Sequence, residues 1–215
     1  MGPRGPNDKV AVHVSRPAVT TFFLIRHGDN DLVGHRIAGR TPGVHLNTRG
    51  QAQARQLADS LGRFSIQHIY SSPLERAVET AEPLARKLEL PIQTSANLVE
   101  IDFGEWNGRV ISELDAIEAW RKWNSFRSAS RTPNGESMIE VQGRMVQEVE
   151  RLRRRHPGST VALFSHGDPL RSVIVHYLGM PLDLLLRLEI SPASVTCFTI
   201  DDWSVRFQFI NSTFS

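Results

Sequence analysis

Two short apolar runs, each followed within three residues by a histidine and a glycine, constrain this chain more than any other feature. Thr20–Ile25 and Thr160–Phe164 consist of β-branched, aliphatic and aromatic residues with the length of a buried strand. His27 and His166 stand directly beyond them. Open α/β sheets bind ligands at the carboxyl ends of parallel strands, so we expect both histidines at one sheet edge.

Amphipathic helices are predicted between and after these strands. Apolar residues recur at helical spacing over 48–61, 74–88 and 138–152, and a further helix is expected over 168–178. Three helix starts resemble a capping box, and the fourth has an acidic cap followed by proline. The expected caps are Thr48 with Gln51, Ser72 with Glu75, Ser137 with Glu140, and Asp168 before Pro169.

Alternating strands and helices predict an α/β fold, a three-layer α/β/α sandwich with a mostly parallel central sheet. Shorter strands are expected over 66–70 and after Pro91, and the chain should close with a hairpin of 194–200 and 205–210. A length of 215 residues fits one domain with an insertion. We expect a flexible leader over 1–16, one domain over 17–215, and within it a helical insertion over 104–136 that covers a pocket, with Trp120 and Trp123 in its core.

Composition and charge argue against several classes of protein. A net charge of +2 does not indicate nucleic-acid binding, and the arginines of 151–155 close a predicted helix, where cations suit the dipole. The single cysteine, Cys197, lies in a strand-like stretch, so we predict a buried thiol rather than a disulfide or a cysteine-based phosphatase. The first residues lack the apolar core of a signal peptide, and no stretch is long enough to cross a bilayer. We expect a soluble, cytoplasmic protein without a membrane partner.

Charged side chains near the His-Gly turns indicate a pocket for a phosphate-sized anion. Arg26 offers a rigid fork of donors suited to phosphate or carboxylate. Arg76 falls in the first turn of a predicted helix, where a cation opposes the dipole unless an anion is held there. Glu100, among apolar neighbours, is either a water-facing residue of an edge strand or an acid kept protonated by its surroundings. Taken singly, His27 has the alternative of a structural histidine, and Arg76 that of an exposed arginine without a task.

Five blocks of sequence carry a resemblance to a known family. They are LIRHG at 24–28, SSPLERAVETA at 71–81, LVEIDFGEWNG at 98–108, GES at 135–137 and FSHGDPLR at 164–171. In this order and spacing, from about Thr20 to the C-terminus, they resemble the histidine phosphatase superfamily, in its branch of phosphoglycerate-mutase-like phosphatases. The resemblance implies a phosphoglycerate-mutase-like fold and metal-independent hydrolysis of a phosphomonoester through a phosphohistidine, with no cofactor.

The same resemblance implies roles for individual residues. His27 would be the nucleophile, and Glu100 the general acid and later the base. Asp168 is a second candidate for the acid, because a related branch places its acid directly after the second histidine; here Gly167 intervenes, so Glu100 is favoured. The residues expected to bind the phosphoryl group or the rest of the substrate are Arg26, Asn30, Gly39, Arg40, Arg76, Trp106, His166 and Gly167. The histidines show no HxH or HExxH spacing, so no metal ligand is predicted.

The chain departs from the family's pattern around the pocket, which leaves the substrate open. Val33 stands where many members have asparagine, Asn30 takes a place usually held by threonine, and 39–46 lacks the usual acidic residue. Candidate substrates include sugar phosphates, phosphoglycerates and nucleotide-like esters such as α-ribazole phosphate. The residues expected at the pocket mouth, which suit an anionic or partly aromatic leaving group, are Arg36, Arg40, Phe103, Trp106 and Arg109.

Two further functions remain as alternatives. A phosphoglycerate mutase would return the phosphate to bound product, although the resemblance implies that such mutases carry longer insertions around the pocket. A domain that only binds phosphorylated partners would not need the acid Glu100. The expected partner is a small phosphorylated substrate, and a homodimer is one option for the assembly.

Overall fold

The computed structural model describes residues 18–214, so the leader predicted over 1–16 lies outside the described residues. The strands are β1 (Thr20–Arg26), β2 (His68–Ser71), β3 (Ile92–Thr94), β4 (Thr160–Ser165), β5 (Val195–Ile200) and β6 (Val205–Ser212). They form one sheet in the order β3-β2-β4-β1-β5-β6. Pairing is parallel from β3 to β1, whereas β5 and β6 are antiparallel to their neighbours. The mostly parallel sheet and the closing hairpin are thus confirmed.

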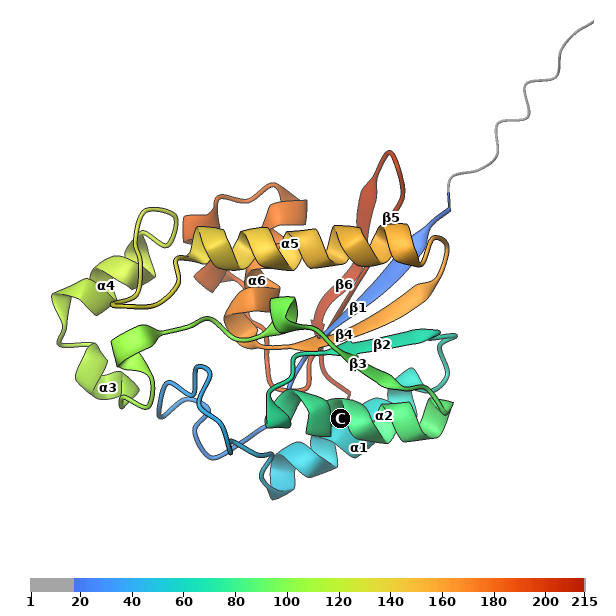
Figure 1. Cartoon of the computed structure of the whole chain (residues 1–215), viewed down its shortest axis with the longest axis horizontal. Coiled ribbons are helices and arrows are strands. Elements are labelled where there is room, and N and C mark those ends of the chain that lie inside the picture. Colours follow the sequence, from blue (N-terminus) through green and yellow to red (C-terminus); the bar gives the residue numbers. More distant parts are fainter. Residues whose placement is uncertain (1–17, 215) are drawn as a thin grey trace, which may run out of the picture.

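Helices cover both faces of this sheet (Figure 1). α1 (Thr48–Leu61) and α2 (Glu75–Leu88) lie on one face, and α5 (Met138–Arg155) and α6 (Gly167–Leu178) on the other. Successive side chains of a strand point to opposite faces, so β1 contributes to two cores. Phe23 packs with α1 and α2, and Leu24 with α5 and α6. The predicted α/β/α sandwich is confirmed.

The remaining elements are short and connect this framework. They are the 3₁₀ helices η1 (Ala96–Leu98), η2 (Gly104–Trp106) and η3 (Leu182–Arg187), and the helices α3 (Ile111–Leu114) and α4 (Glu118–Ser125). The alternative that places Glu100 on an edge strand is wrong, because its segment runs between η1 and η2 and forms no strand. Figure 1 shows α3 and α4 together on the side of the molecule where β1 and β4 end.

The tryptophans of this helical segment belong to the core, as predicted for Trp120 and Trp123. Trp120 is 8% exposed and Trp123 fully buried. Both contact Trp106 through ring edges, with centroids 5.3 Å and 6.4 Å away. Aromatic pairs favour this arrangement, so the three rings hold the helical segment against the rest of the molecule.

Three of the four predicted helix caps differ from the structure. The capping box of Ser137 with Glu140 is present, whereas α1 is capped by Asn47, whose side chain accepts a hydrogen bond from the backbone N–H of Gly50. α2 begins at Glu75 after an N-cap, Leu74, that makes no side-chain bond. α6 begins at Gly167 with His166 at its N-cap, so Asp168 and Pro169 lie inside the helix. The side chains of Glu75 and Asp168 are instead bound to other parts of the chain.

The buried thiol predicted for Cys197 is confirmed. The arginines at the end of α5 form ion pairs with nearby carboxylates, Arg151 with Glu148 at 2.7 Å and Arg153 with Glu150 at 3.0 Å. This agrees with their interpretation as a helix end. Over 18–214, every helix is too short or too polar to span a membrane.

The corrected cap of α1 gives a stability prediction. Asn47→Ala is expected to lower the free energy of unfolding by about 1 kcal/mol, because the Gly50 N–H loses its acceptor. Thr48→Ala, at the residue the sequence favoured, should cost less than about 0.5 kcal/mol. Urea unfolding followed by circular dichroism measures both values, and a larger loss for Thr48→Ala would contradict the observed cap.

Candidate active site

A cavity of about 210 Å³ opens where β1 and β4 end, and we call it the His27 cavity. Its walls come from the turn after β1, the loop that follows, the start of α2, the segment around Glu100 and the first turn of α6. Elements far apart in sequence therefore meet at the edge where the sequence predicted a site. The predicted residues that line it are Arg26, His27, Asn30, Gly39, Arg76, Glu100, Gly167 and Asp168, with Arg36 and Phe103 of the expected mouth.

His27 is placed by the pairing of β1 with β4 and is 4% exposed. Its Nδ1 lies 2.7 Å from the carbonyl oxygen of Gly28. Because a carbonyl only accepts, Nδ1 carries the proton and Nε2 is left with a free electron pair. Burial, together with the cations Arg76 and Arg26, holds the pKa of His27 well below its ordinary value. The imidazole is therefore neutral at pH 7 and suited to nucleophilic attack.

His166 lies beside it, with ring centroids 5.1 Å apart. Its Nε2 is 2.8 Å from the hydroxyl oxygen of Ser72, and its buried Nδ1 has no partner among the described residues. Burial and the cation of Arg76 also hold the pKa of His166 well below its ordinary value. The second histidine thus brings a polar nitrogen to the same place without adding charge.

Two arginines, Arg76 and the partly buried Arg26, supply the positive charge. Arg76 is fully buried, and one of its terminal nitrogens donates to the carbonyl of Gly39 at 2.7 Å. Arg26 donates to the carbonyl of Ile190 at 2.6 Å. The remaining Nε and Nη1 of Arg76, the Nε of Arg26 and the Nδ2 of Asn30 are buried without a partner among the described residues. Buried donors need acceptors, and these four line one cavity, so a tetrahedral oxyanion matches them.

Glu100 is the carboxyl group that holds a proton near neutrality. Burial and the negative charge of Asp168 raise the pKa of Glu100 to about 7, against the opposing effect of Arg76. For Asp168, burial alone would raise the pKa, but ion pairs with Arg127 at 2.8 Å and Arg171 at 3.1 Å outweigh it and lower the value. Of the two candidate acids, Glu100 is therefore the one that can donate a proton at neutral pH.

Besides the fully buried His166, three residues that the sequence placed at the pocket are absent from the cavity lining. Arg40 pairs with Glu136 at 2.8 Å and donates to the backbone carbonyl of Glu100 at 2.9 Å, so it supports the acid from behind. Trp106 is 4% exposed because it packs against the other tryptophans. Arg109 is exposed and lies 3.9 Å from the carboxylate of Glu113.

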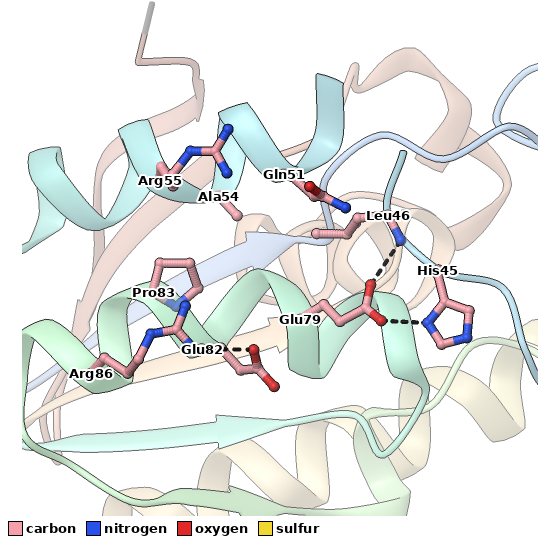
Figure 2. Close-up of a pocket in the computed structure, with 9 residues that line it drawn as sticks. All are labelled: His45, Leu46, Gln51, Ala54, Arg55, Glu79, Glu82, Pro83 and Arg86. Atoms are coloured by element: carbon pink, nitrogen blue, oxygen red, sulfur yellow. Dashed lines mark hydrogen bonds and ion pairs between the residues drawn. The ribbon is translucent and has the colours of Figure 1, made fainter. Parts of the chain in front are cut away.

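Hydrogen bonds to α2 hold the loop that lines the His27 cavity at three points. The carbonyl of Gly39 accepts from Arg76, and the carboxylate of Glu75 accepts from the backbone N–H of Gly43 at 3.0 Å. Glu79 accepts from the backbone N–H of Leu46 at 2.8 Å and pairs with His45, whose pKa it raises (Figure 2). A larger cavity of about 450 Å³ lies beside these contacts, between α1 and α2, and its walls lack the buried histidine pair and arginines described above.

Several residues of the site were missed by sequence reasoning. Ser72 was assigned to a helix cap and Thr80 was given no role, yet the first contacts His166 and the second accepts from the backbone N–H of Gly28 at 2.9 Å. Gly50 of α1 packs directly on the turn after β1, where a Cβ atom would lie 2.0 Å from the carbonyl oxygen of Asp29. Ser72 and Thr80 lie in the sequence block 71–81, which could have indicated their roles, whereas no block contains Gly50. Among residues 18–214, no group of three or more His, Cys, Asp or Glu could hold a metal ion.

The contact of Gly50 with the turn gives a prediction for anion binding. Gly50→Ala should displace the turn that carries His27 and weaken orthophosphate binding by about tenfold or more. Titration calorimetry measures the affinity, and circular dichroism checks that the variant folds. Gly143→Ala on α5 is the control, because a Cβ atom there meets nothing within 4 Å. Unchanged phosphate affinity in folded Gly50→Ala would show that the close approach is not needed.

Comparison with known proteins places the chain in a family. The family model described as "Histidine phosphatase superfamily (branch 1)" matches residues 22–213. Phosphoserine phosphatase 1 of Hydrogenobacter thermophilus is 33% identical over 186 residues, 84% of this chain and 87% of that protein. The probable phosphoglycerate mutase GpmB of Proteus mirabilis is 33% identical over 177 residues, 81% of this chain and 82% of that protein.

A solved structure agrees with these sequence matches. The mycobacterial glucosyl-3-phosphoglycerate phosphatase Rv2419c has a TM-score of 0.82 and 26% identity, covering 91% of this chain and 100% of that chain. The protein therefore belongs to branch 1 of the histidine phosphatase superfamily and is an enzyme that hydrolyses phosphate esters.

Proposed function

We propose that the protein is a metal-independent phosphomonoesterase that acts on a small phosphorylated metabolite through a phosphohistidine. The observation that carries this proposal is the arrangement around His27. A neutral imidazole lies in a cavity with buried donors that have no partner within residues 18–214, and Glu100 with a pKa of about 7 lines the same cavity. These are the parts that phosphoryl transfer to nitrogen requires.

In the first step, Nε2 of His27 would attack phosphorus in line with the leaving oxygen. The new P–N bond forms while the P–O bond to the leaving group breaks. Glu100 gives its proton to the leaving oxygen, so that an alcohol rather than an alkoxide departs. Arg26, Arg76 and Asn30 would donate hydrogen bonds to the phosphoryl oxygens, whose charge they stabilise throughout the transfer.

In the second step, the Glu100 carboxylate would take a proton from water. The water oxygen attacks phosphorus, the P–N bond breaks, and orthophosphate leaves. His27 regains its electron pair and Glu100 its proton, so the enzyme returns to its starting state. No step calls for a metal ion, because the arginines and the second histidine supply the electrophilic contacts.

The substrate would be small and anionic beyond its phosphate. A cavity of about 210 Å³ has room for the phosphoryl group and a short leaving group. Arg36 and Phe103 also line it, which suits a carboxylate or a partly aromatic group. The relatives' names, which mention phosphoserine and glucosyl-3-phosphoglycerate, point to the same chemical range.

A phosphoglycerate mutase is the second candidate, and the relative from Proteus mirabilis favours it. A mutase must keep water away from the phosphohistidine and pass the phosphate to bound product. Isomerisation of a phosphoglycerate faster than phosphate release would support the mutase, and the reverse ratio would support the phosphatase. A domain that only binds phosphorylated ligands would show neither.

The first test is phosphate release from a panel of phosphomonoesters with EDTA present. We expect release by the wild type to persist in EDTA and to fall to background in His27→Ala, because the nucleophile is lost. His45→Ala is the matched control, since this histidine is exposed and lies outside the His27 cavity. Loss of activity in EDTA, or retained turnover in His27→Ala, would contradict the proposal.

The second test concerns the acid. Glu100→Gln should slow steady-state hydrolysis of an alkyl phosphate by about 100-fold or more. With p-nitrophenyl phosphate the first turnover should still release nitrophenol, because this group leaves without a proton, whereas hydrolysis of the phosphohistidine should be slow. Rapid-quench kinetics separate the two steps. Glu105→Gln, an exposed carboxylate of the same segment, serves as the control, and an unchanged rate in Glu100→Gln would move the acid role elsewhere.

A further inference from the structure

A buried ion pair joins the helical segment after η2 to the wall of the His27 cavity. Arg127, directly after α4, is 3% exposed and donates to the Asp168 carboxylate at 2.8 Å. It also donates to the side chain of Asn124 at 2.7 Å and stacks on the ring of Trp123 at 4.6 Å. The other carboxylate oxygen of Asp168 accepts from Arg171 at 3.1 Å. Both oxygens of Asp168 are therefore fixed, one of them by a side chain from outside the α/β framework.

Attachment of the helical segment does not depend on this pair. The next residue, Ser128, donates from its backbone and its hydroxyl to the carboxylate of Asp183 at 2.7 Å and 2.8 Å. The edge-to-face contacts of Trp106 with Trp120 and Trp123 hold the same segment through apolar surface. A buried ion pair adds little net stability, because desolvation offsets its attraction. The position of the pair at the cavity wall therefore points to a role in the chemistry.

Asp168 matters to Glu100 because the other charges around that carboxyl group are positive. Arg26 ends β1 and Arg76 lies at the start of α2, and both favour the ionised form of Glu100. Asp168, from α6, is the negative charge that opposes them. The neighbouring His27 and His166 are neutral. Of the other cations nearby, Arg171 pairs with Asp168, and Arg36 lines the cavity. Arg40 and Arg144 donate to the backbone carbonyl of Glu100 and pair with the carboxylate of Glu136.

We propose that Arg127 is a positioning residue for the reaction: it fixes the Asp168 carboxylate at the wall of the His27 cavity, and the negative charge held there keeps Glu100 in its acid form. This inference rests on the proposed function, in which Glu100 protonates the leaving oxygen. Without Asp168, the field of Arg26 and Arg76 would strip the proton from Glu100 near neutral pH. The helical segment thereby takes part in acid catalysis without touching the substrate.

The test is the pH dependence of the first turnover with an alkyl phosphate. In the wild type, the rate should fall as the pH rises through about 7, because Glu100 must be protonated to act as the acid. Asp168→Asn should move this fall to lower pH by about one unit, since a like charge is removed. Arg127→Met should also move it to lower pH, because the buried Asp168 carboxyl group loses the partner that holds it ionised and in place.

A double variant shows whether Arg127 acts through Asp168. In the Asp168→Asn background, Arg127→Met should cause no further shift of the pH profile. Arg127→Lys, which restores the charge, should return the profile to that of the wild type. Arg131→Met is the control, because Arg131 lies in the same segment but is exposed and pairs with Glu140. Equal profiles for wild type and Arg127→Met, or an unshifted Asp168→Asn, would overturn the proposal.

A readout independent of turnover separates this proposal from the proposed function. Carbon-13 NMR of labelled glutamate, with Glu100 assigned from Glu100→Gln, follows its titration directly. If the wild type hydrolyses nothing but the titration shifts as described, the proposed function fails and the positioning role stands. If hydrolysis occurs and the titration of Glu100 is the same in all the variants, the positioning role fails alone.

Discussion

The register between β1 and β4 is the constraint on which the site depends. Leu24 pairs with Leu163, and two residues later Arg26 pairs with Ser165, so His27 and His166 leave the sheet side by side. A slip of one residue would turn one histidine toward the opposite face of the sheet. The register itself is fixed by burial, because each face of these two strands packs in its own apolar core. Packing of the core and placement of His27 are therefore one and the same requirement.

Gathering cations at this edge of the sheet lowers the stability of the fold, and apolar contacts in other parts of the molecule offset this loss. Arg26 and Arg76 are removed from most solvent, and the partners that hold them are backbone carbonyls rather than carboxylates. Uncompensated buried charge is unfavourable. The extended apolar contacts of α1, α2, α5 and α6 with the sheet supply the opposing stabilisation. Burial, together with these cations, holds the pKa of both histidines well below its ordinary value, so the feature that costs the fold stability also keeps the proposed nucleophile neutral.

Local patterns in the sequence were enough to predict the α/β framework and the residues at the centre of the cavity, but not the residues around them. Apolar runs predicted β1 and β4, and the motif blocks predicted His27, Arg76 and Glu100. The errors arose where a side chain had a partner distant in sequence. Glu75 and Asp168 have the form of capping residues, yet the first binds Gly43 and the second Arg127. Trp106 and Arg40 are chemically suited to a substrate, and only the packing of the helical segment shows that they serve the core and the backbone of Glu100 instead.

The walls of the His27 cavity divide into two parts that depend on different elements of the fold. The donors for the oxyanion come from the ends of strands and from the start of α2, which also holds the 39–46 loop. Another part of the lining, which we call the loop wall, comes from residues 32–38, Phe103 and Ile111, none of which belongs to a strand of the sheet. The loop wall therefore takes no part in the strand register and contains neither Arg26 nor Arg76. Evolution can therefore adapt the cavity to the leaving group of a different substrate by single substitutions, while the residues that bind the phosphoryl group stay in place.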